Sequence, residues 1–480
     1  MTTTTSASLD LLRARMATAI GGRMPGHIER LSWSAGQLAG WQRARLRMLL
    51  ARAIDRSPFH TARLAGIDPA RFELADLPRL PVMTKAQMME RFEEVVTDQR
   101  LTRDVVDQHI AASVAEAALL FGDYVCLVSG GSSGLRGVFV QTAGEYAEFA
   151  ASLMRRAMAA FLAGGGQLAD GLVIGIVAAA SPVHSSGMAA ATATGPPLRL
   201  VSAPATWPTA RIVERLNAAQ PPALIGHASK LAELAGEQRA GRLRLRLRAV
   251  TSVSEMLTPE DREAISGAFG VPVINTFVST EGLVGHSDPG GMMLTFASDT
   301  CIAECVDDAG RPVPNGTASA RVLVTNLHNL TQPLIRYELN DRFVLRSDPT
   351  GGGHLRVSVE GRSDDVFRYG ATIVHPFALT TALLRAGQVR EYQVRQTARG
   401  ADITVVTDAG LDEAALAAAI EQSLRQAGIT EPHVTINRAA AIARDPRTGK
   451  VKRFIATSHG GRSPVARPGS ETQAGGDGHG

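Results

Sequence analysis

Residues 209–277 read TARIVERLNA (209–218), ALIG (223–226), SKLAELAGEQ (229–238), RAVTSV (248–253), PEDREAISGA (259–268) and VPVINTF (271–277), joined by short connections. Segments with helical periodicity alternate here with short apolar strand segments. Thr258 and Pro259 mark the start of the third helix, because threonine is a good N-cap and proline suits the first helical position. The alternation predicts a parallel sheet covered by helices on both faces.

The chain before residue 209 predicts further helices and strands. Residues 10–60 carry a helical periodicity rich in Arg and Ala, and Tyr124–Val128 and Leu172–Ala178 are apolar strand candidates. Between these two strands, Thr142 and Glu145 have the Thr-x-x-Glu spacing of a capping box, which predicts the start of another helix.

The pattern changes after residue 290. Turn signals separate short strands between 290 and 345, which favours an antiparallel, barrel-like piece, and a smaller α/β unit follows Gly361. We therefore expect an α/β fold in which residues 1–360 form a large N-terminal domain with parallel α/β sheets and the small barrel-like piece. Residues 361–457 would form a small C-terminal α+β domain, and the Gly-, Ser- and Pro-rich residues 458–480 a disordered tail.

Composition excludes several classes of protein. The 480 residues are 45% hydrophobic and 20% charged, which rules out a disordered chain and provides ample material for a core. Because 50 basic and 46 acidic residues leave a net charge of only +4, no nucleic-acid partner is expected. Three cysteines, no signal-peptide pattern and no apolar run of bilayer length fit a cytoplasmic protein with no membrane partner.

The segment Leu127–Gly137 is the first candidate binding site. It reads LVSGGSSGLRG, and its small and hydroxyl-bearing residues can bring backbone N–H groups close around phosphate oxygens. It lacks both the Lys-Ser/Thr ending of a Walker A loop and the spacing of a dinucleotide-binding fingerprint. A flexible surface turn is the alternative interpretation.

Four further segments could carry chemistry. Asn275–Glu281 lies at the carboxyl end of a predicted strand, where open parallel sheets bind ligands, although Thr280-Glu281 could also begin a helix. The other three are LIRYELND (334–341), EGRSDD (360–365) and DPRTGKVKR (445–453). Taken singly, these three are readily interpreted as a turn, a charged linker and a solvated loop.

The five segments, in this order, resemble the adenylate-forming (AMP-binding) superfamily of acyl-CoA synthetases, and most of all its phenylacetate–CoA ligase-like branch. Leu80–Lys85 also resembles the N-terminal region of that branch, so that the resemblance covers about residues 45–455. Phe277-Val278 and Leu339-Asn340 depart from the Tyr-Gly and Thr-Gly pairs that the family has at these positions.

The resemblance implies a two-step ligase that acts on a small, aromatic acid. A carboxylate attacks the α-phosphorus of ATP, giving an acyl-adenylate and pyrophosphate, and the thiol of coenzyme A then displaces AMP. Lys450 would reach the α-phosphate and carboxylate oxygens in the first step. Asp364 would be the pivot about which the mobile C-terminal domain then carries Lys450 away.

The resemblance also implies which residues bind the substrates. Thr280 would contact the α-phosphate, and Glu281 would bind Mg²⁺. Asp341, assisted by Arg362, would accept hydrogen bonds from the ribose hydroxyls. The phosphate loop and two adenine-flanking segments would contribute Ser129, Ser132, Ser133, Gly134, Ser254, Glu255, Met256, Asn275, Thr276 and Phe277. The acid pocket would include His184, Val278 and Ser279.

Other functions remain open at this stage. The acyl group could pass to an amine or a carrier protein instead of coenzyme A, and the protein could form a homodimer. A non-catalytic nucleotide-binding homologue is disfavoured by the intact Lys450, and a dinucleotide oxidoreductase by the missing glycine fingerprint. His286, Cys301 and Cys305 are only three candidate ligands for zinc, which prefers four, so buried thiols are the favoured interpretation.

Overall fold

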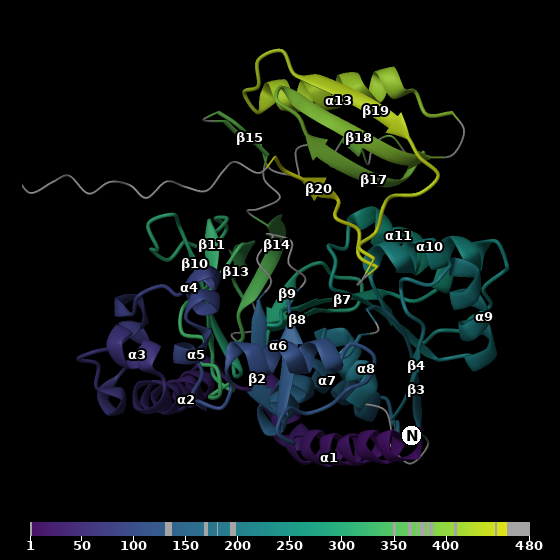
Figure 1. Ribbon diagram of the computed structural model, residues 1–480. Coiled ribbons are helices and arrows are strands. Elements are labelled where there is room, and N and C mark those ends of the chain that lie inside the picture. Colours follow the sequence, from purple (N-terminus) through teal and green to yellow (C-terminus); the bar gives the residue numbers. More distant parts are fainter. Residues whose placement is uncertain are drawn as a thin grey trace, which may run out of the picture.

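The computed structural model describes residues 2–129, 137–167, 171–179, 181–192, 198–348, 352–362, 367–370, 372–374, 379, 382–383, 386, 388–407, 410–446 and 449–457. The chain forms a large body, residues 2–362, and a smaller C-terminal lobe, residues 367–457, which lies above the body in Figure 1. Body and lobe have separate hydrophobic cores. The expected α/β fold with a smaller C-terminal domain is confirmed, whereas the predicted tail lies outside the described residues.

A nine-stranded mixed sheet forms the centre of the body, in the order β13-β14-β9-β8-β7-β6-β5-β3-β4. Its parallel half consists of β3 (Leu172–Val177), β4 (Leu198–Ser202), β5 (Ala223–Gly226), β6 (Ala249–Val253) and β7 (Val273–Val278). The helices between these strands are α8 (Ser185–Thr192), α9 (Thr209–Ala219), α10 (Ala228–Arg239) and α11 (Pro259–Phe269). The predicted parallel sheet is confirmed, and the Thr258 side chain caps α11 by accepting a hydrogen bond from the Asp261 N–H.

Beyond β7 the sheet is antiparallel. The chain turns from β7 into β8 through residues 279–283, a connection too short for the crossover that a parallel pair needs. The antiparallel strands are β8 (Val284–Ser287), β9 (Leu294–Phe296), β13 (Asp341–Arg346) and β14 (Arg356–Arg362). Beside them, β10 (Cys301–Val306), β11 (Arg321–Asn326) and β12 (Tyr337–Leu339) form a three-stranded antiparallel sheet, as the turn signals after residue 290 predicted.

The N-terminal part of the body is mainly helical. The long helix α1 (Thr2–Glu29) packs against α7 (Ala143–Ala163), and α7 begins at the predicted capping box of Thr142 and Glu145. The hairpin β1 (Tyr124–Val128)–β2 (Val138–Thr142) leads into α7. The remaining helices are η1 (Arg30–Ser32), α2 (Ala35–Arg56), α3 (Pro58–Arg63), η2 (Pro69–Arg71), η3 (Leu74–Arg79), α4 (Lys85–Glu90), α5 (Phe92–Val95) and α6 (Arg103–Ala112).

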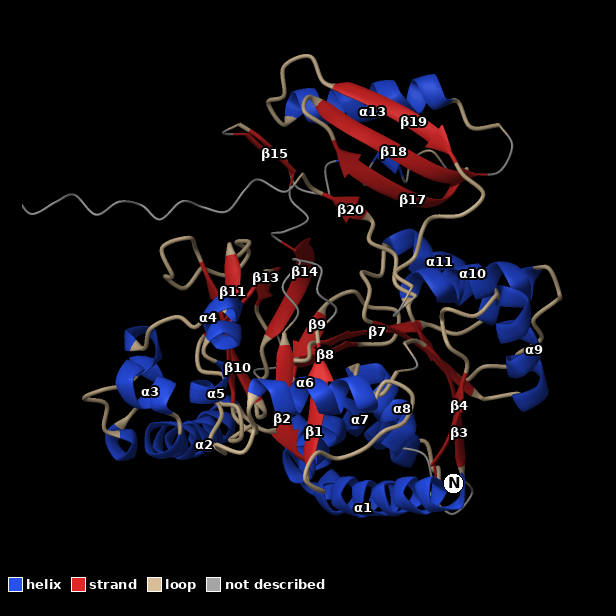
Figure 2. Cartoon of the chain, in the orientation of Figure 1, coloured by secondary structure: helices blue, strands red, loops and turns tan. Residues whose placement is uncertain are grey.

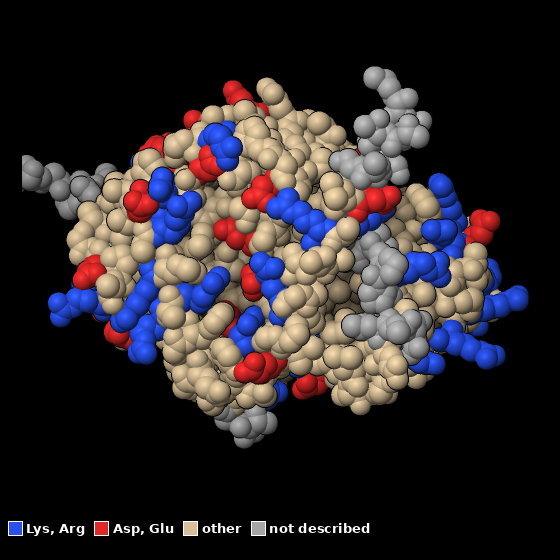
Figure 3. Space-filling model, turned by 90° about the horizontal axis from the view of Figure 1, so that it is seen from below, with Lys and Arg blue, Asp and Glu red and all other residues tan. Residues whose placement is uncertain are grey.

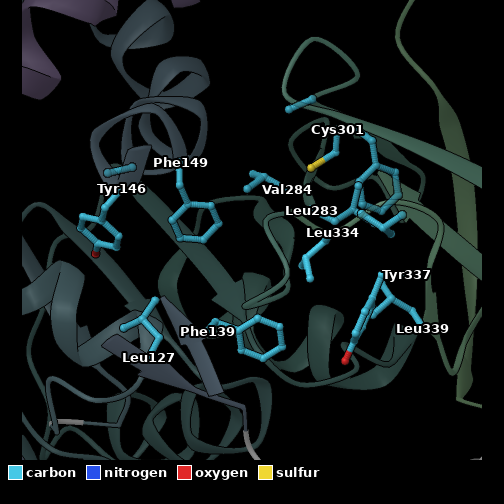
Figure 4. Packing of buried hydrophobic residues seen from close by; sticks show 14 of the residues in the cluster. Leu127, Phe139, Tyr146, Phe149, Leu283, Val284, Cys301, Leu334, Tyr337 and Leu339 are labelled. Carbon is cyan, nitrogen blue, oxygen red and sulfur yellow. The ribbon is translucent and has the colours of Figure 1, made fainter. Parts of the chain in front are cut away.

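The main core joins the hairpin and α7 to both sheets. Figure 4 shows Phe139 and Phe149 among apolar side chains from the turn before β8 and from β12. The rings of Phe139 and Tyr337 lie 6.3 Å apart, edge to face. Cys301 is buried in this cluster, and its thiol lies 3.2 Å from the carbonyl oxygen of Gly282. In the described ranges no three His, Cys, Asp or Glu side chains are grouped as metal ligands would be.

One buried ion pair lies inside the body. Arg155 on α7 donates two hydrogen bonds to the Asp299 carboxylate, at 2.8 and 2.7 Å. Arg30 donates a third, at 2.6 Å. The side chain of Asp299 is fully buried, and the pKa of its carboxyl lies far below its usual value because the two guanidinium groups outweigh the effect of burial. The pair therefore ties the N-terminal helices to the loop before β10.

The C-terminal lobe is a four-stranded sheet with one described long helix (Figure 2). Its strand order is β19-β18-β17-β20. The elements are β15 (Phe367–Tyr369), β16 (Thr372–Val374), β17 (Val389–Gln396), β18 (Gly400–Thr407), α13 (Glu413–Gln426), β19 (His433–Arg438) and β20 (Phe454–Ile455). The helix buries Leu416, Ile420 and Leu424 in the core of the lobe. The small α/β unit predicted after Gly361 is thus observed, while the residue limits of the two domains stay predictions.

The molecular surface carries charges of both signs. On the face seen in Figure 3, basic and acidic side chains are interspersed over most of the area, in keeping with the small net charge of +4. Among the helices of the described residues, none combines the length and the apolar character needed to cross a membrane.

Candidate functional site

The carboxyl ends of the parallel strands bring several candidate residues to one edge of the sheet. Ala205 follows β4, His227 follows β5, Glu255 follows β6, and Thr280 and Glu281 follow β7. Because these strands run parallel, the segments after them emerge at the same edge, where open α/β sheets bind ligands. The C-terminal lobe faces this edge (Figure 1).

The turn after β7 holds Glu281 in a defined position. The carbonyl oxygen of Glu281 accepts a hydrogen bond of 2.8 Å from the Asn326 side chain at the end of β11. Gly282 has a φ of +105°, and a Cβ there would lie 2.3 Å from the same amide nitrogen, so only glycine fits. The interpretation of Thr280-Glu281 as a helix start is wrong, because a tight turn between two strands uses these residues.

The side chain of Glu281 is suited to a cation. Glu281 is buried, and no group in the described part of the chain donates a hydrogen bond to its carboxylate. Burial raises the pKa of Tyr337, and the nearby charge of Glu281 raises it further. Carboxylate oxygens are the ligands that Mg²⁺ prefers, and those of Glu281 are not taken up by hydrogen bonds from described residues. The residues present therefore fit a magnesium ion at this turn.

The phosphate-loop segment is described only at its two ends. Ser129 donates its backbone N–H to the Gly137 carbonyl at 3.0 Å, and the Gly137 N–H donates to the Ser129 hydroxyl at 2.9 Å. A Cβ at Gly137 would lie 2.8 Å from Cε of Lys85, so the stem of this lysine passes the end of the loop. Sequence reasoning did not assign Lys85 to the site. Ser132, Ser133 and Gly134 lie outside the described residues.

A second contact links this loop to the turn after β7. The Nδ1 atom of His184 lies 3.4 Å from the carbonyl oxygen of Val128, next to Ser129. The hydroxyl of Ser185 lies 3.5 Å from that of Thr280. The structure therefore brings three predicted site residues, Ser129, His184 and Thr280, into one neighbourhood from different parts of the chain.

The turn after β6 lies beside the end of β14. Ser254 has a φ of +66°, a left-handed conformation that is uncommon for a residue other than glycine. A Cβ at Gly361 would lie 3.3 Å from Cε of Met256. Arg362 follows Gly361 directly, and its backbone lies opposite that of Asp341 in the register of β13 and β14. The turn of residues 254–256, which is predicted to flank the adenine, therefore lies next to Asp341 and Arg362, which are predicted to bind the ribose.

Two predicted adenine-side residues, Thr276 and Phe277, have side chains that contact other parts of the body. The hydroxyl of Thr276 is buried and lies 3.0 Å from Nδ1 of His286 on β8. The ring of Phe277 packs edge to face against Phe296 and Phe343, each with a centroid separation of 5.5 Å. The Thr276 hydroxyl is therefore directed into the interior, whereas the Phe277 ring stays partly exposed and its adenine contact stays a prediction.

The loop that carries Lys450 is docked onto the body, where the C-terminal chain descends between α10 and β7 in Figure 1. Gly449 has a φ of +72°, and a Cβ there would lie 2.9 Å from Cβ of Ala205, so glycine permits a close approach. The Val451 N–H donates a 2.9 Å hydrogen bond to the Glu255 carboxylate. Arg453 forms an ion pair of 2.7 Å with Asp261. These contacts hold Lys450 at the carboxyl edge of the sheet.

His227 lies beneath the loop of residues 449–453, which we call the lysine loop. It is fully buried, and neither ring nitrogen has a hydrogen-bond partner in the described part of the structure. Burial lowers the pKa of His227 to about 4, and the positive charge of Lys450 acts in the same direction. The imidazole is therefore neutral at pH 7, and Lys450 and Glu255 carry the charges at this point of the edge.

Comparison with solved structures identifies the fold. A crystal structure of 2-hydroxyisobutyryl-CoA ligase in the postadenylation state, in complex with R3-HIB-AMP, is similar with a TM-score of 0.66. The alignment has 19% sequence identity and covers 89% of this chain and 91% of that chain. The chain has the fold of the adenylate-forming CoA ligases. Neither a protein-family model nor a curated protein matches the sequence.

Two further structures with this fold are informative. The same ligase in complex with 2-HIB-AMP and CoA, in the thioesterification state, gives a TM-score of 0.53 at 20% identity, over 88% of this chain and 91% of that chain. ATP-bound MatB from Rhodopseudomonas palustris gives 0.50 at 17% identity, over 67% of this chain and 65% of that chain. Within one ligase, the postadenylation form is therefore the more similar to this chain.

Proposed function

We propose that this chain is an ATP-dependent ligase that activates a small carboxylic acid as an acyl-adenylate and transfers the acyl group to coenzyme A. The observation that carries the proposal is the docking of the Lys450 loop on the sheet edge from which Thr280 and Glu281 also emerge. The resemblance to phenylacetate–CoA ligase-like proteins favours an aromatic acid. The ligases of the same fold, which have acyl-AMP and CoA bound, support the two-step chemistry.

The residues of the sheet edge have separate roles in the first step. Negative charge develops on phosphate oxygens as the carboxylate attacks, so fixed cations and donors there lower the barrier. Lys450 supplies an ammonium group to the α-phosphate and carboxylate oxygens. Ser129 and Thr280 supply hydroxyl donors, and the cation of Lys85 at the loop end attracts the terminal phosphates. Glu281 holds Mg²⁺, which neutralises phosphate charge when bound.

The remaining residues orient the substrates. Asp341 accepts hydrogen bonds from the ribose hydroxyls, and Arg362 stands opposite it on the neighbouring strand. Ser254 and Met256 border the adenine. His184 borders the acid pocket, together with Val278 and Ser279 at the end of β7. Positioning of this kind lowers the barrier because the reacting atoms meet in a productive geometry.

The second step requires that Lys450 leave the site so that a thiol can approach. The pivot that the sequence implies, Asp364, lies outside the described residues and stays a proposal. The movement is supported by the ligase of the same fold, whose thioesterification form is less similar to this chain than its postadenylation form is. A rotation of the lobe would break the contacts of the 449–453 loop with the body.

A two-stage assay tests the proposal. The full chain is incubated with Mg-ATP, labelled pyrophosphate and a panel of aromatic and aliphatic acids, and incorporation of label into ATP is measured. Acid-dependent exchange in the wild type, absent in Lys450→Ala, supports adenylation. No exchange with any acid, although ATP binds, would favour a non-catalytic homologue. Coenzyme A, amines or a carrier protein are then added, and the acceptor that yields product decides between the proposed ligase and its alternatives.

A further inference from the structure

Both carboxylate oxygens of Glu255 are engaged by backbone donors. One accepts a hydrogen bond of 2.9 Å from the Ser229 N–H, and the other accepts one of 2.9 Å from the Val451 N–H. Ser229 lies in the first turn of α10, where backbone N–H groups have no partner within the helix. Val451 directly follows Lys450. A single carboxylate therefore joins the start of a helix in the body to the lysine loop of the lobe.

The local backbone explains why Glu255 takes this position. The left-handed conformation of Ser254 turns the chain sharply as it leaves β6. Glu255 then bonds to the lysine loop, and the next residue, Met256, lies against Gly361 of β14. Burial opposes the charge of Glu255, but the two N–H donors help to hold its pKa below the usual value. The carboxylate is thus ionised, and its hydrogen bonds are charge-assisted.

Other contacts hold the lobe without acting on Lys450 directly. Arg444 donates a hydrogen bond of 2.8 Å to the Ser229 hydroxyl, and Arg453 pairs with Asp261 at 2.7 Å. Both are side-chain contacts several bonds away from the Lys450 backbone. Glu255 differs from these two because it binds the peptide group that joins Lys450 to Val451, whose carbonyl accepts a hydrogen bond of 2.9 Å from the Asp445 N–H within the lobe.

We propose that Glu255 is a positioning residue for adenylation, and that it fixes the Val451 backbone so that the ammonium group of Lys450 points at the reacting centre. The assignment rests on the proposed function and replaces the adenine-flanking role that the resemblance implies for Glu255. Both oxygens already accept backbone N–H groups, so the observed contacts of Glu255 lie between the body and the lysine loop. Because the lobe must rotate before thiol attack, Glu255 acts in the first step and is dispensable in the second.

The test compares Glu255→Gln and Glu255→Asp with Glu260→Gln, a control at an exposed residue of α11. Gln keeps the size of the side chain but offers one acceptor oxygen, so one of the two N–H bonds is lost. Asp keeps both oxygens on a shorter stem. Thermal unfolding of each full-length variant establishes that it is folded. Hydrogen–deuterium exchange of residues 449–453 reports on the Val451 N–H without requiring activity.

We expect the Val451 amide to exchange about 10- to 100-fold faster in Glu255→Gln when the remaining oxygen binds Ser229, and less so when it binds Val451, because that bond is then no longer charge-assisted. Adenylation kcat should fall by a similar factor, while the KM for ATP changes less than about 3-fold. Thioester formation from supplied acyl-adenylate should stay within about 2-fold of the wild type. Glu260→Gln should match the wild type throughout.

Two results would overturn the inference. One is unchanged protection of the Val451 amide in both Glu255 variants. The other is a rise in the KM for ATP that exceeds the fall in kcat, which would make Glu255 a nucleotide contact. Absence of pyrophosphate exchange in the wild type would instead reject the proposed function. In that case, the Val451 amide could still lose its protection from exchange in the Glu255 variants and keep it in Glu260→Gln. This result would still support Glu255 as the residue that holds the lysine loop.

Discussion

Asp341 and Arg362 are backbone partners in the register of the antiparallel strands β13 and β14, at the end where β14 leads toward the C-terminal lobe. Gly361, on the same strand end, lies against Met256 from the turn after β6. Segments that are far apart in the sequence therefore meet where the body passes into the lobe. A nucleotide bound here would touch both the sheet edge and the connection to the C-terminal lobe.

Asp341→Ala should weaken ATP binding more than it slows the chemistry. A carboxylate that accepts hydrogen bonds from ribose hydroxyls contributes about 1.5–3 kcal/mol, so the Kd for ATP should rise about 10- to 100-fold. Calorimetric titration with ATP measures this change. Asp308→Ala, at an exposed residue of a distant turn, should leave the Kd unaltered. Equal affinity of both variants for ATP would remove Asp341 from the site.

Lys450→Ala should lose adenylation while ATP still binds. Removing one fixed charge from the reacting centre costs about 100- to 1,000-fold in kcat, whereas ground-state binding is shared among many contacts. Pyrophosphate exchange and ATP titration together measure the two effects. Lys452→Ala is the matched control, because Lys452 is an exposed lysine of the same loop. Near-normal exchange in Lys450→Ala would reject the role assigned to this residue.

Glu281→Gln should raise the magnesium requirement. An amide is a weaker ligand for a hard cation than a carboxylate, so the Mg²⁺ concentration for half-maximal exchange should increase about 10-fold. The backbone of the turn should be preserved, because Asn326 binds the carbonyl oxygen of residue 281 and not its side chain. Glu263→Gln, at an exposed residue of α11, serves as the control. An unchanged magnesium dependence would contradict the assignment.

Asp299→Asn should destabilise the body strongly. The variant leaves the buried guanidinium of Arg155 without its carboxylate, and breaking such a pair typically costs about 3–5 kcal/mol. Urea unfolding measures the loss. Asp307→Asn removes a surface ion pair with Arg311. This variant should change the midpoint of urea unfolding little, because solvent screens that pair. Similar losses in the two variants would show that burial of Asp299 does not matter.

Stability should fall as the pH decreases from about 6.5 to 4.5. Burial lowers the pKa of His60 and of His286 to about 3, and that of His227 and of His328 to about 4. The unfolded chain binds protons at these residues near its ordinary pKa of 6.5, and the folded chain does not, so acid favours unfolding.

The Glu148 carboxylate contributes to this pH dependence only at lower pH. The pKa of Glu148 lies at about 2 because its hydrogen bond with His27 and nearby arginines outweigh burial, so its contribution is lost below its ordinary value of 4.5. Burial raises the pKa of Glu304 and of Glu391, so thermal midpoints measured at several pH values are compared between the wild type and histidine variants. His328→Gln should flatten the profile, whereas His433→Gln, at an exposed position, should not. A midpoint that is constant from pH 7 to 4.5 would refute the prediction.

The sequence by itself determined the order and type of the elements in the parallel half of the body. The strand at residues 223–226 and the caps at Thr142 and Thr258 are found as predicted. These signals are local, because a cap or an apolar run acts on its own turn or strand. The five candidate segments were also visible, since short side chains, glycines and charges stand out between apolar strands.

Only the tertiary structure decided which side chains meet. Asn326 beneath Gly282, Lys85 beside Gly137 and Glu255 beside Val451 are contacts between segments far apart in the chain. The buried hydrogen-bonded contact of Thr276 with His286, and the packing of the partly exposed Phe277 ring on Phe343, likewise come from other strands. The physical reason is that side-chain direction at a strand end depends on what the neighbouring strand and the docked lobe present, and neither leaves a local pattern in the sequence.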